Sequence, residues 1–381
     1  MTAGPVRMPW SGAGVPHAIV EVNQHCNLDC DGCYKDKFPH SKPVHLLRAE
    51  IDLALARRRL TVLTLAGGEP TLHPQLTEVI AHAARRGLRT ILLSNGTLLS
   101  PEKLRAWRGA GLGRVSIHVD SRQRGRPDAP PASTERALNP LRRALASRCA
   151  EAGLDATLAV TVYADTLAQL PDVVAESLAS PAVTALLVTG YSALADRRRG
   201  GDAHETVTND ALAGVMREAF GARPVWYVPS RHDALARRWL FWEAAVTVDP
   251  GGATRTLWWN PRDRFPLWAL PRLDRLVRGR YHFDPPMTPA TRARVLALHA
   301  ALSLRPGTVA RTAAFLAAAR RNGNLKTCAF IFQESPRERP DGTIDFCLDC
   351  PDATVRDGEL VPICMADRLR PIRRAGSGPR P

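Results

Sequence analysis

The sequence predicts an α/β fold in which parallel strands alternate with helices. Six short apolar segments recur over the first half of the chain, and stretches with the 3.6-residue apolar spacing of an amphipathic helix separate them. Strands and helices that alternate in this way imply a parallel sheet that is covered on both faces.

The elements of this first half can be assigned in chain order. Strands are predicted over residues 17–22, 61–66, 89–94, 114–119, 156–163 and 183–189. Helices are predicted over residues 46–60, 74–84, from Pro101 onward, 134–153 and 167–178. Pro101 suits the start of a helix because N–H groups in the first turn make no hydrogen bond within the helix, so the N–H that proline lacks is not needed there.

The region over residues 205–325 gives a weaker pattern. Helices are predicted over 209–220, 288–302 and 308–321, and a hairpin over 244–259 turns at Asp249-Pro-Gly-Gly252. Five of the eight tryptophans lie between Trp239 and Trp268. They suit an apolar pocket or a lipid contact, but we favour packing of this region onto the first half.

Three cysteines lie close together after the first predicted strand. Cys26, Cys30 and Cys33 have the spacing Cys-x3-Cys-x2-Cys, and Tyr34 follows directly. Three such thiolates can each bind one iron of a [4Fe-4S] cluster and leave the fourth iron open. The alternatives are buried thiols or half of a zinc site, although zinc sites usually combine Cys-x2-Cys with a second, distant pair.

This loop resembles the signature loop of the radical S-adenosylmethionine (radical SAM) superfamily. The resemblance implies a partial (β/α)6 TIM-like barrel in which Cys26, Cys30 and Cys33 hold the cluster and Tyr34 lies beside the adenine of SAM. It also implies an enzyme that reductively cleaves SAM to methionine and a 5′-deoxyadenosyl radical, which takes hydrogen from a substrate.

The segment Gly67-Gly68-Glu69-Pro70 follows the second predicted strand. It resembles the Gly-Gly-Glu-Pro motif of the same superfamily, whose backbone and glutamate receive the SAM amino group. Glycine permits a close approach of the backbone, and a carboxylate suits an ammonium group.

Polar residues also follow the next two strands, at the carboxyl ends where parallel barrels carry their chemistry. Ser94 and Asn95 follow the third strand, and alternation places Ser116, His118 and Asp120 on one face of the fourth. We expect these five residues to contact SAM, with an interior, hydrogen-bonded histidine as an equal alternative for His118. No catalytic residue can be assigned.

A second set of cysteines lies near the end of the chain. Cys328, Cys347, Cys350 and Cys364 form Cys-x18-Cys-x2-Cys-x13-Cys, which can hold a second [4Fe-4S] cluster or a zinc ion. Disulfides are disfavoured because the first cysteine loop needs a reducing compartment. The remaining Cys149 is expected to be a buried thiol.

The segment from Cys350 to Cys364 resembles a C-terminal extension of radical SAM relatives that methylate pterin-like compounds or join lipid chains. In those relatives the cysteines hold an auxiliary cluster. The segment departs from the SPASM and twitch patterns of peptide-modifying relatives.

Five regions are predicted: an N-terminal segment (1–16), a radical SAM partial barrel (17–200), a substrate region of α+β type (201–325), a four-cysteine region (326–368) and a disordered basic tail (369–381). The net charge is +15, but only five of the 52 basic residues are lysines. GC-rich coding explains such an arginine bias, so the charge is weak evidence for nucleic acid. No apolar run reaches the ~18 residues of a membrane span, and residues 1–16 lack the core of a signal peptide, so a cytoplasmic protein is expected.

These observations predict a radical SAM enzyme that forms a carbon–carbon bond or transfers a methyl group on a small molecule or lipid, with a flavodoxin- or ferredoxin-type electron donor. A peptide-modifying maturase and a tRNA-modifying enzyme are the alternatives within the family. A non-catalytic iron–sulfur or zinc protein that binds nucleic acid is the alternative outside it, and it predicts salt-dependent binding without SAM cleavage.

Overall fold

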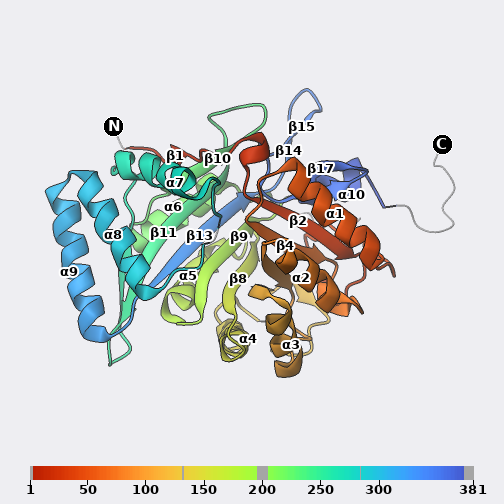
Figure 1. The fold of residues 1–381 in the computed structure, drawn as a ribbon, viewed down its shortest axis with the longest axis horizontal. Helices are drawn as coiled ribbons and strands as arrows, with labels where there is room; N and C mark the ends of the chain where they lie inside the picture. Colours follow the sequence, from red (N-terminus) through yellow and green to blue (C-terminus); the bar gives the residue numbers. More distant parts are fainter. Residues whose placement is uncertain (1–2, 131–132, 195–204, 284, 373–381) are drawn as a thin grey trace.

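The computed structural model describes residues 3–130, 133–194, 205–283 and 285–372. Its centre is an open 13-stranded sheet in the order β1-β10-β11-β13-β9-β8-β6-β5-β4-β2-β16-β17, and β12 pairs with β11 beside this path (Figure 1). The predicted α/β class with a parallel sheet is confirmed, and the strand order does not close into a barrel.

The six predicted strands are neighbours in this sheet, and every pair among them is parallel. They are β2 (His17–Asn23), β4 (Val62–Gly67), β5 (Arg89–Ser94), β6 (Leu112–His118), β8 (Asp155–Val162) and β9 (Val183–Gly190). Their carboxyl ends therefore point to one edge, where the polar residues that follow the strands meet.

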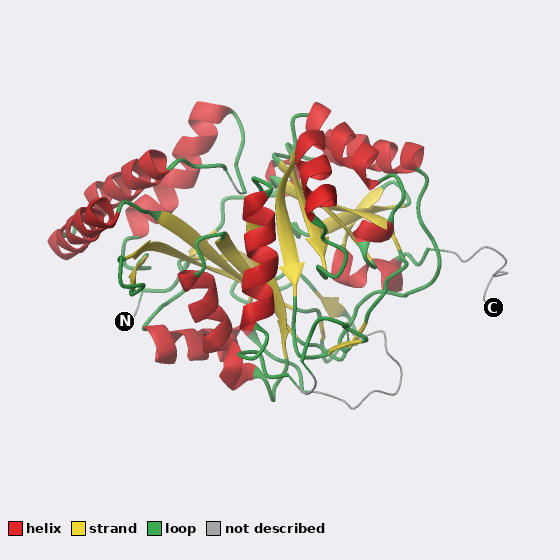
Figure 2. Cartoon of the chain, turned by 90° about the horizontal axis from the view of Figure 1, so that it is seen from below, coloured by secondary structure: helices red, strands yellow, loops and turns green. Residues whose placement is uncertain are grey.

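The helices between these strands are α1 (Val44–Arg57), α2 (Leu76–Arg85), α3 (Pro101–Ala110), α4 (Asn139–Glu151) and α5 (Leu170–Ala179). Helix α4 begins five residues later than the 134–153 pattern predicts. Pro140 lies in its first turn, and proline could not donate the backbone hydrogen bond that an earlier helix start would need. Figure 2 shows the helices lying outside the strands.

The second half of the chain extends the same sheet. The predicted hairpin is formed by β11 (Arg237–Val248) and β12 (Thr254–Trp258), and β10 (Trp226–Pro229) is antiparallel to β11. Strand β13 (Lys326–Glu334), which the patterns did not predict, lies between β11 and β9. The sheet thus runs across the boundaries at residues 200 and 325.

Helices α6 (Asn209–Phe220), α8 (Pro289–Ser303) and α9 (Pro306–Asn322) match the predicted patterns, whereas α7 (Arg264–Arg278) was not predicted and contains Pro271. Leu296 of α8 and Phe315 of α9 pack against Ala245 of β11. Helices α7 to α9 form the group at one end of the molecule in Figure 1.

The last elements of the chain lie beside β2, the first of the six parallel strands. Strand β16 (Ala353–Arg356) pairs with β2 and with β17 (Glu359–Pro362), and α10 (Ile363–Leu369) follows. The predicted region 326–368 therefore reaches both edges of the parallel strands, through β13 at one edge and β16 at the other (Figure 1).

The short elements are β1 (Val6–Arg7), β3 (Asp29–Cys30), β7 (Gln123–Arg124), β14 (Arg337–Glu338), β15 (Ile344–Asp345), and the 3-10 helices η1 (Gly12–Gly14), η2 (Pro70–Leu72) and η3 (Leu167–Gln169). Of the predicted disordered tail, residues 373–381 lie outside the described residues. None of the helices in the described ranges is long and apolar enough to cross a membrane.

Candidate active site at the carboxyl ends of the strands

A pocket of about 180 Å³ lies at the carboxyl edge of the parallel strands. The three cysteines of the first loop line it, and so do six of the ten predicted SAM-contacting residues: Tyr34, Gly67, Gly68, Ser94, Asn95 and His118. Glu69, Pro70, Ser116 and Asp120 do not line it. The fold therefore brings most of the predicted site together in one hollow.

The cysteine loop is held by contacts with the ends of later strands. Cys30 pairs with Gln123 in the short β3–β7 ladder, and the Tyr163 hydroxyl donates to the Asp31 carbonyl at 2.6 Å. Gly32 has φ +66°, and a Cβ there would lie 2.8 Å from the Tyr191 ring. Only glycine fits this turn, because both the backbone conformation and the neighbouring ring exclude a side chain.

The three thiols share one electrostatic environment. Burial raises the pKa of Cys30, and the nearby Asp120 and Cys33 raise it further. Burial lowers the pKa of Lys37, but Cys33, Cys30 and Cys26 outweigh this effect and leave it raised. Lys37 lines the same pocket as the three thiols, and its charge offsets part of the repulsion among thiolates.

These residues fit the donor set of an iron–sulfur cluster. All three cysteines are free and partly exposed to the pocket. Over the described residues, no group of three or more His, Cys, Asp or Glu side chains has the geometry that holds a single metal ion. A cubane cluster does not need that geometry, because each thiolate binds a different iron.

Two glycines bring the end of β4 against the start of the cysteine loop. A Cβ on Gly68 would lie 2.2 Å from the His25 carbonyl oxygen, and one on Gly67 would lie 2.5 Å from the Asn23 carbonyl oxygen. The Glu69 N–H donates to the His25 carbonyl at 2.8 Å. The close approach of two backbones explains why this motif needs glycine.

Glu69 is fully buried behind the pocket wall. Its carboxylate accepts hydrogen bonds from the Ser94 hydroxyl at 2.9 Å, the Asn95 N–H at 2.8 Å and the Thr71 N–H at 3.0 Å. Burial raises its pKa, although these hydrogen bonds oppose the rise. Glu69 therefore positions Ser94 and Asn95, which follow one another at the end of β5 and line the pocket. Pro70, the next residue after Glu69, begins η2.

His118 and Asp120 form a polar pair at the end of β6. His118 Nε2 lies 2.9 Å from Asp120 Oδ2 and 3.3 Å from the Thr161 hydroxyl. Burial by itself raises the pKa of Asp120, but the hydrogen bond and charge of His118 outweigh burial and lower it. Asp120 thus orients His118, which projects into the pocket. Ser116 is buried, and its hydroxyl has no hydrogen-bond partner among the described residues.

Three of the four C-terminal cysteines lie together. Cys347 is the main cause of the raised pKa of Cys350, through a hydrogen bond, followed by burial and the nearby Cys364. The Trp239 indole N–H donates to Cys347 Sγ at 3.2 Å. Cys364, at the start of α10, lines the pocket together with Asp352. This second group therefore adjoins the same hollow as the first cysteine loop.

Cys328 lies apart from the other three cysteines. It is fully buried in the main core opposite Ala244, with its sulfur 3.9 Å from the Ser177 carbonyl oxygen, and burial raises its pKa to about 12. Gln333, five residues along β13, bonds Asp352 near the pocket at 2.8 Å. Five residues of strand span roughly 16 Å, so the structure does not bring Cys328 to the predicted four-cysteine site.

Patterns in the sequence did not predict the contribution of C-terminal segments to the pocket. Gln333 from β13 and Asp352 before β16 both line it. Arg356 of β16 forms ion pairs with Glu21 and Asp367, and Lys35 pairs with the same two carboxylates. The sequence contained one signal of this ion-pair network, namely Glu21 within an apolar strand, because a buried charge requires charged partners.

Comparisons with known proteins relate part of this chain to one family. The sequence model of one family, the radical SAM superfamily, matches residues 20–166. GTP 3′,8-cyclase of Stenotrophomonas maltophilia is 34% identical over 121 residues, which cover 30% of this chain and 37% of that protein. PqqA peptide cyclase of Bradyrhizobium diazoefficiens is 29% identical over 176 residues, which cover 43% of this chain and 44% of that protein.

Among solved structures, SuiB of Streptococcus suis has 16% identity and a TM-score of 0.41, covering 54% of this chain and 45% of that one. The chain spans less than half the length of the two curated relatives.

Proposed function

This chain belongs to the radical SAM superfamily through residues 20–166, and on this premise we propose that it cleaves SAM reductively and functionalises a C–H bond of its substrate. Members of this superfamily are enzymes. The observation that carries the proposal is the shared pocket, in which Cys26, Cys30 and Cys33 face the residues at the ends of β4 and β5.

Cys26, Cys30 and Cys33 would hold a [4Fe-4S] cluster, which supplies an electron to the sulfonium of SAM. The protein contributes position and exclusion of water. Gly67 and Gly68 leave their backbone open to the pocket, and Glu69 fixes Ser94 and Asn95 beside them. Groups held in place before the reaction lower its entropic cost, and an enclosed site protects a radical from side reactions.

A second metal group is proposed at Cys347, Cys350 and Cys364 rather than at all four C-terminal cysteines. These three influence one another electrostatically, and Cys364 reaches the pocket wall. Three thiolates would leave one position of a second cluster for another ligand. Because Cys364 and Asp352 line the same hollow as the first cysteine loop, a group held by these cysteines would adjoin the proposed substrate pocket.

The substrate is proposed to be a small polar molecule, and the reaction carbon–carbon bond formation or methyl transfer. Polar side chains of His118, Gln333 and Asp352 line part of the hollow of about 180 Å³, and they would hold the polar groups of such a molecule. A peptide substrate is the second candidate, since a relative that shares 43% of this chain is a peptide cyclase. An external flavodoxin- or ferredoxin-type protein would deliver the electron.

The test is SAM cleavage by the full chain after anaerobic reconstitution with iron and sulfide. With dithionite as reductant, the wild-type protein is expected to release 5′-deoxyadenosine, and Cys33→Ala is expected to release none. Cys149→Ala is the matched control, because Cys149 is buried in the core away from the pocket. A wild-type protein that binds at least about four irons per chain but leaves SAM intact would contradict the proposal.

A further inference from the structure

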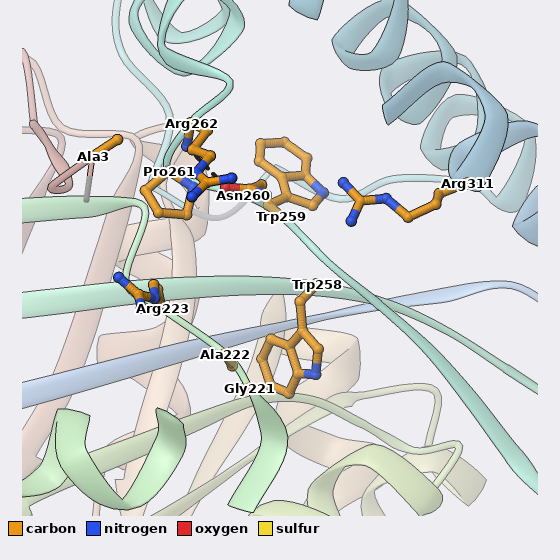
Figure 3. A pocket seen from close by; sticks show the side chains of 10 residues that line it. All are labelled: Ala3, Gly221, Ala222, Arg223, Trp258, Trp259, Asn260, Pro261, Arg262 and Arg311. Atoms are coloured by element: carbon orange, nitrogen blue, oxygen red, sulfur yellow. Dashed lines mark hydrogen bonds between the residues drawn. The ribbon is translucent and has the colours of Figure 1, made fainter. Parts of the chain in front are cut away.

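A second cavity lies outside the site at the strand ends, and the proposed reaction makes no use of it. It has a volume of about 230 Å³. Its lining combines three arginines, Arg223, Arg262 and Arg311, with Trp258 and Trp259, and none of the described residues that line it is acidic (Figure 3). A cavity with a formal charge of +3 and two indoles suits an anionic ligand that also has a flat apolar part.

The cavity arises from the way two strands share one edge of β11. Strand β13 occupies one edge of β11, and both β10 and β12 pair along the other. Trp226 at the start of β10 is opposite Phe241, and Trp258 at the end of β12 is opposite Ala244. The chain before β10 and the chain after β12 therefore meet end to end, and the cavity lies at this junction.

The junction is far from the first site along the strands. Across the sheet, Trp258 of β12 pairs with Ala244 of β11, and Ala244 pairs with Cys328 of β13. Gln333, which lines the first site, lies five residues farther along β13 than Cys328. This separation is roughly 16 Å along the strand direction alone. A ligand in the junction cavity would therefore not overlap the proposed SAM site.

The three guanidinium groups come from different segments of the chain. Arg223 precedes β10, Arg262 follows β12 and Arg311 belongs to α9, and all three are exposed. Across the described part of the chain, none of them is within ion-pair distance of a carboxylate. In Figure 3, Arg311 reaches from α9 toward Trp259, and Arg223 approaches from the opposite side.

The acidic residue nearest to Arg262 in the sequence is engaged elsewhere. Asp263 is buried, accepts a hydrogen bond from the Thr308 hydroxyl at 3.1 Å and lies 3.6 Å from the Arg305 guanidinium. An adjoining hollow shares Arg262 and Arg311 with the cavity and includes the first turn of α9. The positive end of the helix dipole adds to the field of the arginines.

The indole rings are held in place by packing against other ring side chains. Trp258 contacts the Phe330 ring at 5.1 Å between centroids, and Trp259 contacts His299 at 4.3 Å and Trp226 at 5.5 Å. Rings fixed in this way offer a preformed surface, which lowers the entropic cost of binding a planar group.

We propose that this junction cavity binds a nucleotide, with its phosphates at Arg223, Arg262 and Arg311 and its base against the indoles. Arginine is the residue best suited to phosphate because its planar guanidinium donates two parallel hydrogen bonds. A diphosphate matches three cations better than a single carboxylate does, and the indoles supply the surface for the base.

The test is calorimetric titration of the reconstituted full chain with ADP, GDP, CDP and UDP. S-adenosylhomocysteine is present throughout, so that the nucleotides cannot occupy the SAM site. At least one nucleotide is expected to bind with a Kd below about 1 mM. Pyrophosphate and the matching nucleoside are expected to bind more weakly than the nucleotide, because each lacks half of the contacts.

Two triple variants separate specific binding from the effect of total charge. Arg223→Gln/Arg262→Gln/Arg311→Gln is expected to weaken nucleotide binding by at least about tenfold, as the loss of several charge-assisted hydrogen bonds implies. Arg217→Gln/Arg320→Gln/Arg321→Gln removes the same charge from exposed positions on α6 and α9 outside the cavity and is expected to have no effect. Iron content and circular dichroism check that both variants are folded.

Three results would overturn the proposal. The first is the absence of binding by all four nucleotides at millimolar concentration. The second is equal weakening by the two triple variants, which would indicate a general charge effect. The third is binding of a single-stranded RNA that is tighter than the binding of every mononucleotide and is lost in the cavity variant.

Discussion

The Lys35 ammonium lies 2.9 Å from an Asp367 carboxylate oxygen, and both side chains are almost completely buried. Lys35 follows the first cysteine loop directly, whereas Asp367 belongs to α10, the helix that begins beside Cys364. Glu21 and Arg356 complete the network. A buried set of charges therefore joins the two cysteine groups, although more than 300 positions separate Lys35 from Asp367 in the sequence.

Lys35→Met is expected to destabilise the protein by about 3–5 kcal/mol, since it leaves two buried carboxylates short of a positive partner. Urea unfolding of the reconstituted protein measures this change. Lys103→Met removes the same charge from an exposed position on α3 and is expected to stay within about 0.5 kcal/mol of the wild type. Equal midpoints for the two variants would contradict the prediction.

The same network predicts a loss of stability in acid. Burial by itself raises the pKa of Asp367, but the Lys35 charge and its hydrogen bonds outweigh burial and lower it below the ordinary value. A carboxyl group with a lowered pKa in the folded state stabilises the fold above the unfolded pKa of about 3.9, and this contribution is lost as the pH falls through the folded value.

The free energy of unfolding of the wild type and of Asp367→Asn, measured between pH 7 and pH 3, tests whether this contribution is lost in acid. The difference in the free energy of unfolding is expected to be largest near neutral pH and to shrink below about pH 4. A difference that stays constant over this range would show that the Asp367 charge does not stabilise the fold.

Gly68→Ala is expected to prevent assembly of the first metal site. The new Cβ would lie 2.2 Å from the His25 carbonyl oxygen and 2.8 Å from that of Gln24, so the backbone that leads to Cys26 must move. Iron content after reconstitution should fall, and stability should fall by about 1–3 kcal/mol.

Gly214→Ala is the matched control, because no atom lies within 4 Å of its added Cβ on α6. Its iron content should equal that of the wild type, and it should gain about 0.5–1 kcal/mol of stability as a helix-interior alanine. Full iron content in Gly68→Ala would show that the cysteine loop tolerates displacement.

Cys328→Ala and Cys347→Ala distinguish a three-cysteine site from a four-cysteine site. With Cys328 remote from the pocket, Cys328→Ala should keep the second metal group, whereas Cys347→Ala should lose it. Iron and zinc per chain measure the outcome after anaerobic reconstitution. About four irons fewer in Cys347→Ala alone would indicate a cluster, and lost zinc would indicate a structural site. Equal metal loss in both variants would show that Cys328 is also a ligand of the second metal group.

Local patterns in the sequence were sufficient for the barrel strands and for most helices. The spacing of apolar residues predicted β2 and β9 to within a residue, because strands buried on both faces are continuous apolar runs. Strand β13 and helix α7 escaped prediction. Strand β13 depends on pairing with β9 and β11, which are distant in sequence, and Pro271 in α7 argued against a helix.

By itself, the sequence determined the first cysteine loop, the glycines beside it and their position at the carboxyl ends of parallel strands. These features depend on neighbours in the chain: the spacing of thiols, the turn at Gly32 and the period of the apolar residues. Only the tertiary structure separated Cys328 from Cys347, Cys350 and Cys364, joined Lys35 to Asp367 and assembled the junction cavity around Arg223, Arg262 and Arg311. Each of these depends on which strands are paired, and backbone hydrogen bonds between distant segments leave no local pattern in the sequence.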